Sequence, residues 1–138
     1  MKKLLIINAV GLSEELISDN TPHLQHYYKQ NKQYLKPPCP AVTCTSQATL
    51  TTGKTPQEHG IVANGWYFRD LAQVWLWRQT NQLIEGEKFW DKIKKEKPNF
   101  TTAKMFWWYN MYSSADMSVT PRPIYRSDGS KFPGSYAH

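Results

Sequence analysis

Hydroxyl side chains gather in one short stretch of the chain, residues 40–64, which reads PAVTCTSQATLTTGKTPQEHGIVAN. Hydroxyls just ahead of a helix commonly cap it, because they accept hydrogen bonds from the free amides of its first turn. The same place also suits chemistry on an anion, since backbone N–H groups converge there and the helix dipole favours negative charge. Residue types alone leave both interpretations open.

The order of short motifs along the chain favours the chemical interpretation. Asn64 lies 21 positions after Thr43 and ends a series that runs LLIIN (4–8), TPHL (21–24), PAVT (40–43), TTG (51–53) and PQEHGI (56–61). In this order and spacing the chain resembles the alkaline phosphatase superfamily, and within it the nucleotide pyrophosphatase/phosphodiesterase group. The resemblance covers residues 3–64 well and the aromatic remainder only loosely.

The resemblance implies a role for two of these residues in hydrolysing phosphodiester, pyrophosphate or phosphonate bonds of a phosphorylated small molecule. Thr43 is the expected nucleophile, which a base or a metal must activate. Two divalent cations, zinc or manganese, about 3.5–4 Å apart would bind its alkoxide together with the phosphoryl oxygens. Asn64 would donate its amide N–H to a non-bridging oxygen. The alternatives are a buried capping hydroxyl for Thr43 and a turn residue before Gly65 for Asn64.

Two departures from the family pattern concern the metal ligands. Val10 stands before Gly11 where the family has a metal-binding aspartate, so the nearest oxygen ligand is Asn8, whose amide brings no charge. Asn8 is otherwise a strand-end residue. After Thr43 the chain also has no Asp-His pair and no Asp-x-x-x-His. We therefore expect Asn8 and Thr43 to bind metal incompletely. The other ligands would come from the remainder of the catalytic domain or a second copy.

A second comparison, with the sulfatases of the same superfamily, is less favourable. Registering LTTG (50–53) on their motif places Thr43 at the modified cysteine, but Gln47 replaces the arginine and Cys44 is one residue out of register. The cysteine pair Cys39 and Cys44 lacks the further ligands of a zinc site. A disulfide between them has no support, because no secretory signal precedes it. We expect a cytoplasmic protein.

Apolar periodicity and helix signals predict an α/β fold, a partial parallel sheet flanked by helices. Residues 1–138 are expected to be a single N-terminal fragment of an alkaline-phosphatase-like catalytic domain. Thr45 and Ser46 are expected to cap a helix that Gly53 closes. The expected strands are 4–10, 74–79 and 102–108, with an extended segment at 116–125, and the expected helices are 14–17, one opening at Pro22, 46–52 and 87–95.

The composition suggests two other functions, nucleic-acid binding and binding of a partner protein. The formal charge is +6, but the lysines of segment 88–97 alternate with Asp91 and Glu96, which indicates a solvated helix face rather than a nucleic-acid site. Six Trp, eight Tyr and five Phe are many for a short chain to cover, so an inactive fragment that binds a partner is the main alternative.

Trp66 and Tyr67 are expected either to line a substrate pocket or to pack in the core. No segment is long enough to cross a membrane.

Overall fold

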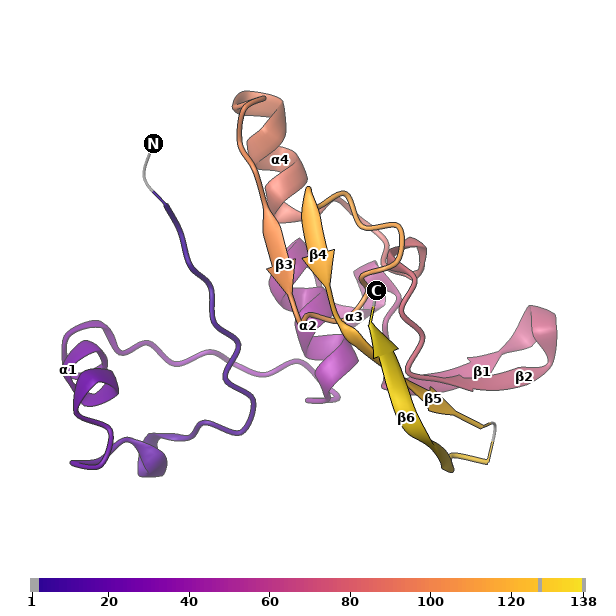
Figure 1. The fold of residues 1–138 in the computed structure, drawn as a ribbon, viewed down its shortest axis with the longest axis horizontal. Helices are drawn as coiled ribbons and strands as arrows, with labels where there is room; N and C mark the ends of the chain where they lie inside the picture. The colour runs from indigo at the N-terminus through magenta and orange to yellow at the C-terminus, as the bar shows by residue number, and fades with distance from the viewer. Residues whose placement is uncertain (1–2, 127, 138) are drawn as a thin grey trace. The chain divides into compact units, whose positions relative to one another are not determined.

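The computed structural model describes residues 3–126 and 128–137, which fall into two compact units, one ending at Lys36 and the other beginning at Pro37. The first unit contains a one-turn 3-10 helix, Glu14–Leu16, and helix α1, Pro22–Asn31 (Figure 1). Helix α1 begins at its proline, as predicted, because the fixed φ of proline suits the first helical position. Neither helix buries a residue.

The prediction of a buried strand at residues 4–10 is wrong. This stretch pairs with no strand among the described residues, and its apolar side chains are exposed, with Leu5 at 81% and Ile7 at 75%. A strand needs a neighbour that takes up its N–H and C=O groups. The apolar run therefore predicts what kind of strand the segment can form, but not that a partner is present.

The second unit combines helices with three two-stranded sheets in the described part of the chain, and this confirms the predicted α/β class. Its helices are α2 (Thr43–Thr52), α3 (Pro56–His59) and α4 (Phe89–Glu96), with 3-10 turns at Arg69–Leu71 and Asn81–Leu83. The antiparallel pairs are β1 (Gly65–Phe68) with β2 (Gln73–Leu76), and β5 (Pro121–Tyr125) with β6 (Lys131–Ala137). The parallel pair is β3 (Ala103–Met105) with β4 (Met117–Val119) (Figure 1).

Two predicted strands are shorter than the apolar pattern indicated. Strand β2 ends at Leu76, because Trp77 adopts a left-handed backbone with φ 54°. Strand β3 ends at Met105 for the same reason, since Phe106 has φ 62°. A left-handed residue turns the chain out of the extended conformation. Strand β2 is also antiparallel to its partner, so the predicted strand at 74–79 is not part of a parallel sheet.

Helix α2 begins three residues before the predicted start, at Thr43, with extended Val42 as its N-cap residue. Thr45 and Ser46 therefore lie inside its first turn, and their predicted capping role is wrong. The helix ends at Gly53, whose φ of 68° is the left-handed conformation expected of a closing glycine. The side chain of Val42 does not cap the helix. The Asn64 side chain, 20 residues after Cys44, accepts a first-turn amide instead.

The core of the second unit is built around α2. Cys44 and Ala48 lie one turn apart on the same helix face, as residues at i and i+4 do. Burial of each large apolar side chain that packs on this face stabilises the folded chain by about 1.5–3 kcal/mol, and these contacts hold the short helix in place. The buried cluster comprises Cys44, Ala48, Ile61, Ile84 and Tyr109, with Trp66, Trp77, Leu83 and Trp108 packed against it.

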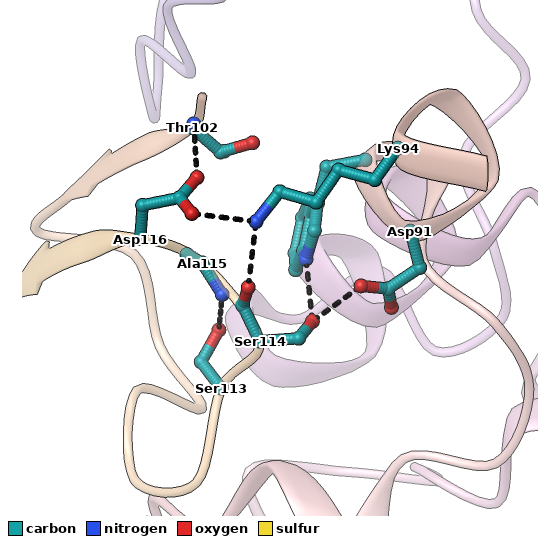
Figure 2. Close-up of polar contacts among 8 residues, drawn as sticks. Asp91, Lys94, Thr102, Ser113, Ser114, Ala115 and Asp116 are labelled. Atoms are coloured by element: carbon teal, nitrogen blue, oxygen red, sulfur yellow. Dashed lines mark hydrogen bonds and ion pairs between the residues drawn. The ribbon is translucent and has the colours of Figure 1, made fainter. Parts of the chain in front are cut away.

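A polar network ties α4 to the chain that enters β4 (Figure 2). Lys94 Nζ donates to the Ser114 carbonyl at 3.2 Å and to Asp116 Oδ1 at 2.8 Å. Asp116 Oδ2 in turn accepts the Thr102 amide at 2.7 Å, and the Ser114 hydroxyl donates to Asp91. The carboxylate of Asp116 thus links α4 to the start of β3, which fixes β3 and β4 side by side.

Candidate active site

The two residues predicted to do chemistry come together at the start of α2. Thr43 is the first residue of that helix and is half-buried, while Asn64 directly precedes β1. Asn64 Oδ1 accepts a hydrogen bond from the Cys44 amide at 2.9 Å. The Asn64 side chain therefore lies one peptide unit from Thr43 and acts as the missing cap of the helix.

The Thr43 side chain is not used to hold the helix. Its hydroxyl makes no hydrogen bond to any residue that the structure describes. The capping interpretation of Thr43 therefore has no contact to support it. The amides in the first turn of a helix have no acceptor within the helix. Asn64 accepts a hydrogen bond from only one of them, the Cys44 amide. A free hydroxyl thus lies where amides and the helix dipole favour an anion.

The contacts of Asn64 also determine which way its amide faces. Because Oδ1 accepts from the Cys44 amide, Nδ2 is the group left to donate. The Asn64 carbonyl accepts the Trp77 amide at 2.8 Å, which fastens the residue to the end of β2. The Asn-Gly pair does not form the hairpin turn, since strands β1 and β2 are joined through Arg69–Leu71.

Close packing at Gly65 keeps Asn64 in this position. A Cβ atom on Gly65 would lie 2.8 Å from the Trp75 carbonyl oxygen and would also collide with Leu76 Cδ2. The backbone contact cannot be relieved by a side-chain rotation, so only glycine allows β1 to approach β2 this closely. The residue after the candidate oxyanion donor is therefore restricted by packing rather than by its dihedral angles.

Two buried glutamines that the sequence did not single out support the same region. Gln47, one turn after Thr43, accepts the Trp108 amide at 2.8 Å, and Gln79 accepts the Tyr109 amide at 3.0 Å. Their partners lie 61 and 30 residues away along the chain. Sequence periodicity is local, so no signal in the sequence indicates these contacts.

Cys44, the cysteine next to Thr43, lacks the features of a nucleophile. Cys39 and Cys44 are free thiols, so no disulfide joins them. Burial raises the pKa of Cys44 to about 11, although its contact with Tyr109 lowers that pKa somewhat. The thiol beside Thr43 therefore stays protonated at neutral pH, and the thiolate is the reactive form.

His59 is structural in this arrangement. Its ring is fully buried, Nδ1 accepts the Ile61 amide at 3.1 Å, and Nε2 therefore carries the proton towards Thr49 Oγ1 at 3.0 Å. Burial lowers the pKa of His59, which keeps the ring neutral. Both ring nitrogens are occupied, so His59 is not available as a base for Thr43.

The two rings predicted to contact substrate do not share a surface. Trp66 and Tyr67 are neighbours in β1, and neighbouring side chains of a strand point to opposite faces. Trp66 stacks on Phe68 at 5.0 Å and packs against the core cluster. Tyr67 is 56% exposed. The structure therefore separates the core-packing ring from the solvent-facing one.

The described residues do not fit a pair of divalent metal ions. No group of three or more His, Cys, Asp or Glu side chains gathers within residues 3–126 and 128–137. Thr43 and Asn64 offer a hydroxyl and an amide, which carry no charge to offset a divalent cation. Asn8 belongs to the first unit, so its place relative to Thr43 is not defined.

A hydroxyl without a hydrogen bond at a helix start, an asparagine that caps the next residue and an α/β chain together define a candidate acyl- or phosphoryl-transfer site. Comparison with known families decides the class: the model of the type I phosphodiesterase / nucleotide pyrophosphatase family matches residues 4–136. The chain therefore belongs to this family of hydrolases, and the match extends through the aromatic region beyond Asn64. Among curated proteins and solved structures, no match to the chain was found. No described helix has the length and apolarity needed to cross a bilayer.

Proposed function

We propose that the chain contributes the nucleophile half of a metal-dependent site that hydrolyses phosphodiester or pyrophosphate-type bonds, or phosphonates, in a phosphorylated small molecule. The observation that carries the proposal is the 2.9 Å hydrogen bond between Asn64 Oδ1 and the Cys44 amide. It leaves Asn64 Nδ2 as a donor on a side chain one peptide unit from Thr43, whose hydroxyl makes no hydrogen bond to the described residues. A hydroxyl serving only as a cap would instead bond to backbone amides.

In this proposal Thr43 Oγ attacks phosphorus, a new P–O bond forms, and the bond to the leaving oxygen breaks. Negative charge builds on the non-bridging oxygens, where Asn64 Nδ2 donates a hydrogen bond. Water then hydrolyses the phosphothreonine and restores the hydroxyl. The Thr43 proton passes to solvent water, because both ring nitrogens of His59 are engaged.

Two divalent ions, zinc or manganese, remain part of the proposal. If such ions were held there, they would supply Lewis acidity that lowers the pKa of the Thr43 hydroxyl and offsets phosphoryl charge. Because the described residues do not supply a charged ligand set, further ligands would come from the remainder of the catalytic domain or a second copy. Asn8 as a ligand, Trp66 and Tyr67 as substrate contacts and a cytoplasmic location also stay proposals.

Hydrolysis of bis-p-nitrophenyl phosphate in the presence of Zn²⁺ or Mn²⁺ tests the nucleophile. Thr43→Ala should abolish hydrolysis, while Thr43→Ser, which keeps a hydroxyl, should retain part of it. Ser46→Ala is the matched control, since it removes a hydroxyl from the same helix one turn further on. Equal rates for wild type and Thr43→Ala would rule out Thr43 as the nucleophile.

The first unit favours one alternative, an inactive chain that acts as an interaction module. Its apolar side chains are strongly exposed, Leu5 at 81% and Leu35 at 80%, and exposed apolar surface commonly marks a binding site. Calorimetry with Zn²⁺ and Mn²⁺, combined with light scattering, separates the two functions. A well-folded dimer that ignores both metals and hydrolyses nothing would favour the module.

A further inference from the structure

Lys104 is a buried cation at the centre of β3. It is 6% exposed, its Nζ donates to the Tyr109 carbonyl at 2.8 Å, and it lies 5.6 Å from the centre of the Trp90 ring. Lys104 forms no ion pair with any residue in the described ranges. Burying an unpaired ammonium is costly, so the contact it makes has to offset that cost.

The carbonyl that Lys104 holds belongs to a strained residue. Tyr109 has φ 60°, a left-handed conformation that an aromatic residue adopts only when its surroundings enforce it. Three contacts enforce it here: Lys104 holds the carbonyl, Gln79 accepts the amide at 3.0 Å, and the buried ring contacts Cys44. Lys104 is the only charged group among the three.

The same turn reaches both halves of the candidate site. On one side, Tyr109 packs against Cys44, the residue after Thr43, and the Trp108 amide bonds to Gln47 of the same helix. On the other side, the Tyr109 amide bonds to Gln79, two residues beyond the Trp77 amide that holds Asn64. The 108–109 turn therefore closes a ring of contacts around the start of α2.

We propose that Lys104 is a positioning residue for Thr43 and Asn64, acting through its hydrogen bond to the Tyr109 carbonyl. This bond fixes the Tyr109 carbonyl, and with it residues 108–109, against α2, and the bond itself is strongest when the amine is protonated. The structural part of this inference stands by itself. Its catalytic part rests on the proposed function.

The groups that face Lys104 have pKa values that differ from its own, so a change near pH 8 can be assigned to Lys104. Burial, together with a smaller effect of the Lys88 ammonium, lowers the pKa of Lys104 to about 8. Burial also raises the pKa of the Cys44 thiol to about 11 and that of the Tyr109 hydroxyl above its usual range. Lys104 therefore loses its charge near pH 8 while Cys44 and Tyr109 stay protonated, and its bond to the Tyr109 carbonyl then comes from a neutral donor.

Amide hydrogen exchange tests the structural part with Lys104→Met in the full chain. Loss of a hydrogen bond to a charged group should speed exchange of the Trp108 and Tyr109 amides by about 10- to 100-fold. Lys88→Met is the matched control, because that buried lysine bonds to the carbonyls of Ile84 and Gly86 instead. Unchanged exchange at Trp108 and Tyr109 in Lys104→Met overturns the proposal, whether or not the chain hydrolyses anything.

The pH profile of bis-p-nitrophenyl phosphate hydrolysis tests the catalytic part. The wild-type rate should fall above about pH 8. Lys104→Met should be slower and lack this fall, and Lys88→Met should keep it, shifted to higher pH. A wild-type profile in Lys104→Met overturns the positioning role. If Thr43→Ala hydrolyses as fast as wild type, the proposed function fails instead, while the exchange result stands.

A wild-type measurement covers the case in which Lys104→Met does not fold. Exchange protection of Trp108 and Tyr109 is then compared at about pH 7 and pH 9, corrected for intrinsic exchange rates. Because an open turn returns Lys104 to its ordinary pKa and therefore binds the proton more readily than the folded chain, opening should become less favourable and protection of the two amides should rise. Constant protection overturns the proposal.

Discussion

Asn64 caps a helix to which it is not adjacent in sequence: its side-chain oxygen accepts the Cys44 amide at 2.9 Å, beside Thr43. The capping contact and the donor role in the proposed function therefore use different atoms of one side chain. Its oxygen stabilises the start of α2, and its nitrogen is left to donate to a ligand.

Substitutions at Asn64 should separate these two functions. Asn64→Asp keeps an acceptor for the Cys44 amide, so the free energy of unfolding should change little, while Asn64→Ala should lose about 1 kcal/mol as other cap deletions do. Both variants lack the donor and should lower kcat by about 10²–10³-fold. Urea unfolding and phosphodiesterase assays measure the two effects. If Asn64→Asp retains wild-type hydrolysis, Asn64 is a cap only.

The buried His59 should make stability depend on pH on the acid side. Burial lowers the pKa of His59 from its ordinary value near 6.5, so the unfolded chain takes up the proton first as pH falls. The free energy of unfolding should therefore decrease below about pH 6.5 and be insensitive to this group above it.

Urea unfolding of His59→Gln at several pH values checks this. The variant should lose the acid-side decrease that the wild type shows, and His23→Gln, which changes an exposed ring, should keep it. An identical pH dependence in wild type and His59→Gln would show that the ring titrates normally in the folded chain.

The buried Lys104 should make the free energy of unfolding depend on pH on the alkaline side. Its pKa in the folded chain is about 8 against an ordinary value of 10.5, so between these values the unfolded chain binds more protons. Stability should rise with pH across this interval, because the cost of the buried charge disappears. The difference in unfolding free energy between wild type and Lys104→Met should change with pH in this interval and be constant elsewhere.

Gly65→Ala should disturb the site through packing alone. The added Cβ would meet the Trp75 carbonyl at 2.8 Å and force β1 away from β2. Overpacking of this kind costs about 1–3 kcal/mol, and here it should also reduce hydrolysis, since Asn64 is the preceding residue. Gly129→Ala serves as a control, because its nearest atom there is a side-chain carbon at 3.8 Å. That control should lose stability from its positive φ without affecting hydrolysis.

The sequence by itself determined the parts that depend on local chemistry and motif order. The α/β class, the start of α1 at Pro22, the end of α2 at Gly53 and the family all follow from short-range signals, and the structure and the family match confirm them. Proline and glycine fix backbone dihedrals at their own positions, so their effects can be predicted without knowing the fold.

Contacts between distant residues were decided only by the tertiary structure. The apolar run at 4–10 predicts a strand, yet pairing depends on a neighbour that the run does not encode. Thr45 and Ser46 resemble capping residues, but the acceptor for the helix is Asn64. Gln47, Gln79 and Lys104 act on a turn far along the chain. Hydrogen bonds form between groups that folding brings within about 3 Å, and spacing in sequence does not report that proximity.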